Sequence, residues 1–279
     1  MRSWRRVTLS GAGPVPEDLI ACLHESGCLG AEIREGLVLA YFPEEMGASA
    51  VAADLARLIG PALGALRVES CEPVTDGRWH ERWVEGLAPI RVGRRFWIVP
   101  GLEAPGRLDG RHALRVTPGR AFGTGEHPTT RMCLELLEEE VRPGWSLLDV
   151  GTGSGILAIG GGMLGAAPVL GIDIDEMAIQ VARENAAANG VPGMLFAAAG
   201  PEALRLRRFD LLVANLDAQT LARSMGCLST LVERRVIVSG ILRPQRRLVE
   251  EAAARVGLGR ASVRLSGEWV AILLERVGG

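Results

Sequence analysis

The stretch LLDVGTGSGILAI, residues 147–159, carries the residue types and spacing best suited to binding a small molecule. An apolar run ends at Val150 and is followed by Gly151, Gly153 and Gly155, after which a helical pattern begins. Glycines at such a turn let the backbone approach a ligand, and the N-terminus of the following helix offers unpaired N–H donors. The spacing therefore predicts a ligand-binding loop between a strand and a helix.

Two acidic residues accompany this loop. Asp149 lies two residues before the first glycine of the loop. Asp173 ends the next apolar run, about 20 residues on, where a carboxylate can accept both hydroxyls of a ribose. The sixth position of the glycine pattern is Ile156, and no GK[ST] follows, which argues against dinucleotide and P-loop phosphate sites. An acid immediately before the loop suits a ligand with an amino-acid end. We therefore predict S-adenosylmethionine, with its methionine part at the loop and its ribose on Asp173.

A third polar residue follows the apolar run FDLLVANL, residues 209–216. Asn215 lies at the carboxyl end of this predicted strand, the edge at which open α/β sheets bind ligands. Two interpretations of Asn215 remain open at this point. It is either a residue of the binding site or the N-cap of the helix expected over 218–231, and the two roles can coexist.

The segment TPGRAFGTGEHPTT, residues 117–130, holds a second glycine pair, Gly123 and Gly125, shortly before the first loop. Two glycine-rich loops so close together indicate that both face one ligand. Within the segment, His127 is a candidate general base. Because Pro128 and a helix start follow it, His127 is equally a candidate for a helix cap.

The elements that must position these residues follow from the apolar patterns. From about residue 111 to the C-terminus, strands that are continuous apolar runs alternate with helices, which is typical of a parallel sheet covered on both faces. We predict a doubly wound α/β sheet over 111–279, in which the closing pair of strands contributes one antiparallel strand. Residues 1–75 follow a β-α-β-β-α-β order, the ferredoxin-like arrangement.

Residues 76–110 are rich in tryptophan and arginine, and we expect them to connect the two domains. Trp79 and Trp83 would share one face of a helix, packed against both domains. Stacking on nucleic acid is the alternative. The balance of 33 acidic and 31 basic residues, a formal net charge of −2, argues against a nucleic-acid or membrane-surface binder.

The composition also excludes several classes of protein. Its five cysteines show no CxxC spacing and fit neither a zinc site nor a secreted disulfide scaffold, so no metal is expected. No stretch approaches the 18 apolar residues of a membrane span. We expect a cytoplasmic, monomeric protein.

Taken together, TPGRAFGTGEHPTT, LLDVGTGSGILAI, GIDID, ENAAANG, DLLVANL and SGIL resemble the PrmA-type enzymes, which methylate protein L11 of the large ribosomal subunit. The resemblance covers essentially the whole chain. It implies a Rossmann-like, seven-stranded class I methyltransferase domain preceded by a small ferredoxin-like α+β domain that docks the substrate. Glu126 and the LDAQ stretch after Asn215 depart from the family pattern and bear on substrate fit.

The resemblance also implies roles for individual residues. The segment Phe122 to Thr130 would fold over the cofactor, with Phe122 covering the sulfonium. We expect Asn215 and backbone carbonyls to orient the accepting amine without a strong side-chain base, His127 as base being the alternative. The predicted cofactor-binding residues are Phe122, Thr130, Asp149, Gly151, Gly153, Gly155, Asp173 and Asn215.

The predicted function is therefore transfer of methyl groups from S-adenosylmethionine to lysine ε-amines, the N-terminal α-amine or both, of a large-subunit ribosomal protein, free or on the ribosome. No sequence-specific nucleic acid and no membrane are expected as partners. A related methyltransferase acting on another protein lysine or on a small molecule is one alternative. A non-catalytic S-adenosylmethionine-binding module on the ribosome is the other.

Overall fold

The computed structural model places two compact units along the chain, Met1–Leu87 and Ala88–Gly279, and each is described by itself. The residues that the structure describes are 4–11, 19, 23, 26–28, 30–34, 37–43, 46, 53, 66–74, 88–101, 109–117, 125, 127–204 and 207–277.

The smaller unit contains an antiparallel sheet in the order β2-β3-β1-β4. Its four strands agree in number with those of the predicted β-α-β-β-α-β order. Buried Val7, Leu9 and Phe42 form its core. Most of the two predicted helices lies outside the described residues. The strands are β1 (Trp4–Gly11), β2 (Gly30–Arg34), β3 (Leu37–Pro43) and β4 (Leu66–Val74).

The larger unit contains a seven-stranded sheet in the order β10-β9-β8-β11-β12-β14-β13, as the resemblance implied. Within this sheet β14 runs antiparallel to both of its neighbours, and the other pairs are parallel. β14 is inserted between β12 and β13 and does not form the edge. The strands are β8 (Leu147–Val150), β9 (Val169–Asp173), β10 (Met194–Ala198), β11 (Phe209–Asn215), β12 (Val232–Leu242), β13 (Leu258–Ser266) and β14 (Trp269–Arg276).

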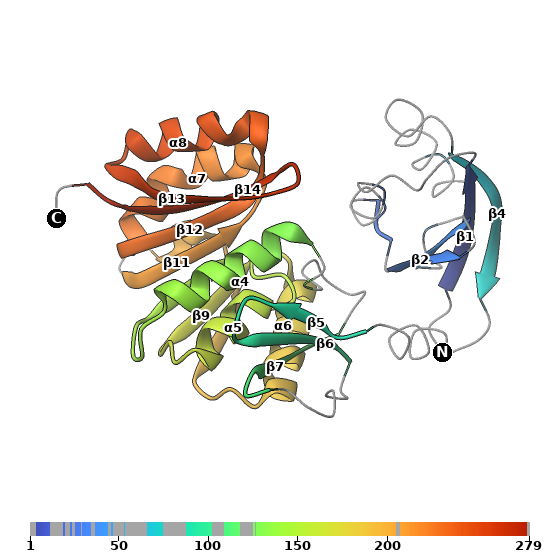
Figure 1. Ribbon diagram of the computed structural model, residues 1–279, viewed down its shortest axis with the longest axis horizontal. Coiled ribbons are helices and arrows are strands. Elements are labelled where there is room, and N and C mark those ends of the chain that lie inside the picture. The colour runs from blue at the N-terminus through green and yellow to red at the C-terminus, as the bar shows by residue number, and fades with distance from the viewer. Residues whose placement is uncertain are drawn as a thin grey trace. The chain divides into compact units, whose positions relative to one another are not determined.

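Helices cover both faces of this sheet (Figure 1). All four residues of β8 are buried, which explains why the strand is apolar on both faces apart from Asp149. Leu147 packs into the cluster on one face and Leu148 into the cluster on the other. The first face carries α4 (Pro128–Glu140), α5 (Ile156–Met163) and α6 (Glu176–Asn189); the second carries α7 (Ala218–Leu231) and α8 (Arg246–Ala254), with 3₁₀ turns η1 (Pro201–Leu204) and η2 (Arg243–Gln245).

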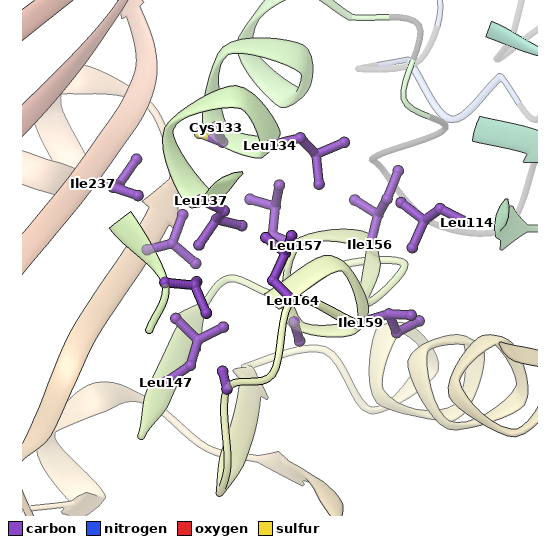
Figure 2. Packing of buried hydrophobic residues seen from close by; sticks show 14 of the residues in the cluster. Leu114, Cys133, Leu134, Leu137, Leu147, Ile156, Leu157, Ile159, Leu164 and Ile237 are labelled. Atoms are coloured by element: carbon purple, nitrogen blue, oxygen red, sulfur yellow. The ribbon is translucent and has the colours of Figure 1, made fainter. Parts of the chain in front are cut away.

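Figure 2 shows the first cluster, in which side chains of α4, α5 and β8 converge. Helix α5 contains consecutive glycines although each costs about 1 kcal/mol relative to alanine in a helix. A Cβ atom on Gly160 would lie 2.7 Å from Leu134 Cδ2, and one on Gly161 would overlap Leu147. The glycines therefore let α5 pack closely between α4 and β8.

The predicted connector over 76–110 needs correction in its second half. Residues from Ala88 onward belong to the larger unit, where β5 (Ile90–Val92), β6 (Phe96–Pro100) and β7 (His112–Val116) form a three-stranded sheet. The physical reason is that Phe96 and Ile98, both fully buried, pack into the core on the α4–α5 face. Trp79 and Trp83 lie outside the described residues. Within the described part of the chain, no helix combines the length and the apolarity needed to cross a membrane.

Candidate active site

The glycine loop between β8 and α5 folds tightly at the carboxyl end of the central strands. Gly151, Gly153 and Gly155 have φ angles of 71°, 52° and 80°, in the left-handed region that glycine enters without steric cost. The N–H groups of Gly151 and Thr152 both donate to the carbonyl of Ile172 at 2.9 Å, which ties the loop to the neighbouring strand β9. Gly155 is the N-cap of α5, so the helix begins directly behind the loop.

Asp149 lies beneath this loop and is completely buried. Its Oδ2 accepts hydrogen bonds from the Thr152 hydroxyl at 2.7 Å and from the Ala158 N–H at 3.1 Å. Desolvation by burial raises the pKa of Asp149 from 3.8 to about 7, because the charged form loses its hydration. No donor from the described residues reaches its Oδ1. One carboxyl oxygen thus fastens the loop to the start of α5, and the other is left to accept a further hydrogen bond.

Asp173 ends β9, which pairs in parallel with β8. Its Oδ2 accepts from the Gly153 N–H and its Oδ1 from the Asp175 N–H, both at 3.0 Å. Each carboxylate oxygen can accept more than one hydrogen bond. Asp173 can therefore stay bonded to the loop while accepting the two hydroxyls of a ribose, and the geometry fits the group predicted for it.

The start of α4 meets the end of β11 at the same edge. His127 is the N-cap of α4, with its Nδ1 accepting from the Thr129 N–H at 3.3 Å, and Pro128 occupies the first helical position. Asn215, the last residue of β11, donates from Nδ2 to the Thr129 hydroxyl oxygen at 3.1 Å. This bond joins two motifs that are 86 residues apart in the sequence.

The interpretation of Asn215 as the cap of the following helix is wrong. The N-cap of α7 is Asp217, whose Oδ1 accepts from the N–H groups of Gln219 and Thr220 at 3.0 and 2.9 Å. Strand β11 extends through Asn215 and the chain continues past Leu216 before the helix begins. Asn215 is therefore available to serve the site.

Three acceptor atoms at this edge are buried without a hydrogen-bond partner among the described residues: Thr130 Oγ1, Asp149 Oδ1 and Asn215 Oδ1. The pairing of β8 with β11 places Asp149 opposite Val213, two residues before Asn215. Leaving a buried acceptor unpaired costs about 1–3 kcal/mol. Bound groups with N–H or O–H donors would satisfy these atoms.

The second glycine segment is described only in part. Gly125 is buried with a φ of 83°, and a Cβ atom there would overlap Ile98 and lie 3.2 Å from Ile156 Cδ1. The segment therefore passes against the first residue of α5, beside the main glycine loop. Phe122 and Gly123 lie outside the described residues.

Asn185 of α6 belongs to the ENAAANG motif of the family resemblance, but no role for it is predicted from the sequence. Asn185 is buried, accepts from the Thr117 N–H at 3.1 Å and donates to the Ser154 carbonyl at 2.8 Å. Its amide joins the main glycine loop to the start of the segment that carries the second glycine pair. A buried polar residue on an otherwise small and apolar helix face was the available signal.

Comparison with known proteins shows the family to which the chain belongs. The family described as ribosomal protein L11 methyltransferase (PrmA) matches residues 29–277. A ribosomal protein L11 methyltransferase of Geobacter sulfurreducens is 39% identical over 254 residues, covering 88% of this chain and 84% of that protein.

A solved structure of an L11 methylase supports the same family, and a more distant one shows the fold. The crystal structure of a ribosomal protein L11 methylase from Lactobacillus delbrueckii subsp. bulgaricus is 33% identical with a TM-score of 0.65, covering 68% of this chain and 99% of that chain. A putative SAM-dependent methyltransferase from Streptococcus mutans, 11% identical with a TM-score of 0.51, covers 62% of this chain and 56% of its own and shares the fold alone. Because the family match spans nearly the whole chain, this protein belongs to the PrmA family of ribosomal protein L11 methyltransferases.

Proposed function

We propose that this protein transfers methyl groups from S-adenosylmethionine to amino groups of ribosomal protein L11, at lysine ε-amines, the N-terminal α-amine or both. The observation that carries the proposal is the convergence of three unpartnered buried acceptors, on Thr130, Asp149 and Asn215, at the carboxyl edge of the sheet. Membership of the PrmA family supports the reaction class and the substrate.

The cofactor, when bound, supplies an already activated methyl group on a sulfonium. The chain has to hold and orient that group. Gly151 and Gly153 allow the backbone to approach the methionine part, and Asp173 accepts the ribose hydroxyls. Thr130 Oγ1 and Asp149 Oδ1 accept hydrogen bonds from the donors of the amino-acid end.

The methyl acceptor must be a neutral amine, although a free lysine has a pKa of about 10.4. Desolvation in the site, next to a positive charge, lowers the pKa of the amine and favours its neutral form. Asn215 Oδ1 accepts an N–H of the amine and thereby turns the nitrogen lone pair toward the methyl group. Orientation of this kind supplies much of the acceleration in transfer reactions.

The test uses the purified chain, labelled S-adenosylmethionine and unmethylated L11, with mass spectrometry to locate the label. We expect label on L11 amines, and its loss in Asp173→Ala. Cofactor binding without label on L11 would move the acceptor to another protein or a small molecule. Cofactor binding without transfer to any offered amine would instead favour a non-catalytic module. A cytoplasmic location and a monomeric state stay predictions.

A further inference from the structure

Thr129 and Thr130 are adjacent, equally buried, and differ in their hydrogen bonds. Thr130 Oγ1 has no partner among the described residues, which suits a ligand contact. Thr129 Oγ1 instead lies 2.6 Å from His127 Nδ1 and 3.1 Å from Asn215 Nδ2. The hydroxyl of Thr129 is thus committed to protein partners and stands between the helix cap and the amide.

The backbone N–H of Thr129 fixes the direction of these hydrogen bonds, because it is a donor in every protonation state. The backbone N–H of Thr129 can only donate, so His127 Nδ1 accepts and the ring proton resides on Nε2. The Thr129 hydroxyl therefore donates its proton to Nδ1 as well, and its lone pairs receive the Asn215 Nδ2 group. The amide is fixed in one orientation, in which Oδ1 is the atom left to accept.

His127 and Asn215, the two ends of this series of hydrogen bonds, are both held in place by other contacts. His127 is held at the N-cap of α4, and its ring meets the ring of Trp269 from β14 edge-on, with 4.6 Å between centroids and 73° between planes. Asn215 is held by the pairing of β11 with β12, opposite Ser239. The hydrogen-bond relay of His127, Thr129 and Asn215 therefore joins the start of α4 to the end of β11, and the ring contact between His127 and Trp269 adds β14.

We propose that Thr129 and His127 are positioning residues that hold the Asn215 amide with Oδ1 toward the methyl acceptor. This inference rests on the proposed function. A rotated amide would present Nδ2 donors to an amine whose N–H groups are donors too, and the amine would lose its orientation. His127 acts here as an acceptor toward Thr129, so its Nδ1 lone pair is not available to remove a proton from the amine.

The first pair of variants tests the hydroxyl. Thr129→Val has nearly the same shape but cannot relay the bond, whereas Thr129→Ser can. Since displacement of a positioning group costs up to about 100-fold in rate, we expect Thr129→Val to lower kcat about 10- to 100-fold with cofactor Kd unchanged. Thr129→Ser should recover most of the activity. Thr230→Val, the same replacement on an exposed threonine of α7, is the matched control and should retain wild-type kcat.

The second pair tests the histidine and is informative even where a threonine variant folds poorly. His127→Asn places an amide oxygen near the position of Nδ1 and remains a good N-cap, but it cannot act as a base. We expect His127→Asn to keep kcat within about threefold of wild type and His127→Ala to lose about tenfold. If His127→Asn is as inactive as His127→Ala, the imidazole itself takes part in the chemistry and the proposal is overturned.

A readout independent of L11 separates this inference from the proposed function. The side-chain amide signal of Asn215 in ¹⁵N spectra, assigned by its loss in Asn215→Ser, should exchange slowly with solvent in the wild type and in Thr129→Ser. It should exchange rapidly in Thr129→Val. Unchanged exchange in Thr129→Val, or unchanged kcat, contradicts the relay. Absence of L11 methylation by the wild type, with the amide behaving as expected, contradicts only the proposed function.

Discussion

Gly240 and Leu216 are in direct backbone contact: a Cβ atom at Gly240 would overlap the carbonyl oxygen of Leu216. Gly240 sits at an irregularity of β12 with a φ of 84°, and the Leu216 N–H donates to the Ser239 carbonyl at 3.0 Å. On its other side, the Leu216 side chain fills the space in front of Gly151, where a Cβ atom would lie 2.5 Å from Leu216 Cδ2. Leu216 thus contacts both β12 and the glycine loop, and these contacts help to fix the position of the preceding residue, Asn215.

Replacement of Gly240 by alanine should therefore damage both stability and activity. The left-handed φ and the overlap with Leu216 together should lower the free energy of unfolding by about 2–3 kcal/mol. The displaced Leu216 should also lower kcat, because Asn215 precedes it directly. Urea unfolding and initial rates on the same preparations measure the two effects.

Gly226→Ala is the control for this variant. Gly226 lies in α7 with open space around its Cβ position, so alanine should stabilise the protein by about 0.5–1 kcal/mol. Equal effects of the two replacements would mean that the contact between Gly240 and Leu216 has no energetic consequence.

Loss of the Asp173 carboxylate should weaken cofactor binding. Asp173→Ala removes the acceptor for the Gly153 N–H and the acceptors proposed for two ribose hydroxyls. Hydrogen bonds to a charged group contribute about 1.5–3 kcal/mol each. We expect Kd for S-adenosylmethionine to rise about 100-fold or more, measured by titration calorimetry.

Asp175→Asn controls for the loss of one negative charge at the same strand end. Asp175 caps α6 by accepting from the Met177 N–H, and asparagine caps equally well. The Kd of Asp175→Asn for S-adenosylmethionine should stay close to that of the wild type. A comparable loss in both variants would assign the effect to net charge and not to the Asp173 contacts.

The pH dependence of stability should report Asp149. Its pKa in the folded protein, about 7, lies above the value of about 3.9 expected when unfolded. Between these values the folded state retains a proton that the unfolded state releases. The contribution of Asp149 to stability is therefore complete below the unfolded pKa and is lost as pH rises through about 7.

Asp149→Asn provides the reference, because asparagine does not titrate. The free energy of unfolding of the wild type minus that of Asp149→Asn should decrease as pH is raised from about 5 to about 8. Denaturant unfolding of both proteins at several pH values measures this difference. A difference that is constant or increases with pH would show that Asp149 is not protonated preferentially in the folded state.

Replacement of Asn185 should destabilise the larger unit. Asn185→Leu keeps the side-chain size but leaves the Thr117 N–H and the Ser154 carbonyl unpaired, and each unpaired buried group costs about 1–3 kcal/mol. Thermal and urea unfolding should show a loss of about 2–5 kcal/mol. Gln180→Ala, on the exposed face of the same helix, should change stability by less than about 0.5 kcal/mol. If Asn185→Leu lost as little stability as Gln180→Ala, Asn185 would not link the glycine loop to the segment that begins at Thr117.

Much of the larger unit could be predicted because its signals are local. The strands are apolar runs, since both faces of the sheet are covered, and the predicted helix over 218–231 coincides with α7. Glycines that require a left-handed φ stand out in the sequence, and so do polar residues at strand ends. Gly151, Asp173 and Asn215 are predicted as site residues in this way.

Other features have no local signal. Strands β5 and β6 lie in a segment whose tryptophans and arginines favour a connector, and the pairing of the β5–β6–β7 sheet depends on the core against which Phe96 and Ile98 pack. The sequence does not distinguish the roles of Thr129 and Thr130, because two adjacent threonines differ only in the hydrogen-bond partners that the fold brings to each. The bond from Asn215 that distinguishes them spans 86 residues.

The sequence by itself therefore determined the class of fold, the glycine loop and the family, because periodicity, backbone freedom and motif spacing are properties of short stretches. The tertiary structure decided that Asp217 and not Asn215 caps α7, and that His127 caps α4 and meets Thr129. It also decided which oxygen atoms remain unpaired at the sheet edge. Hydrogen-bond partners are chosen by the packing of distant segments, and no local pattern records that choice.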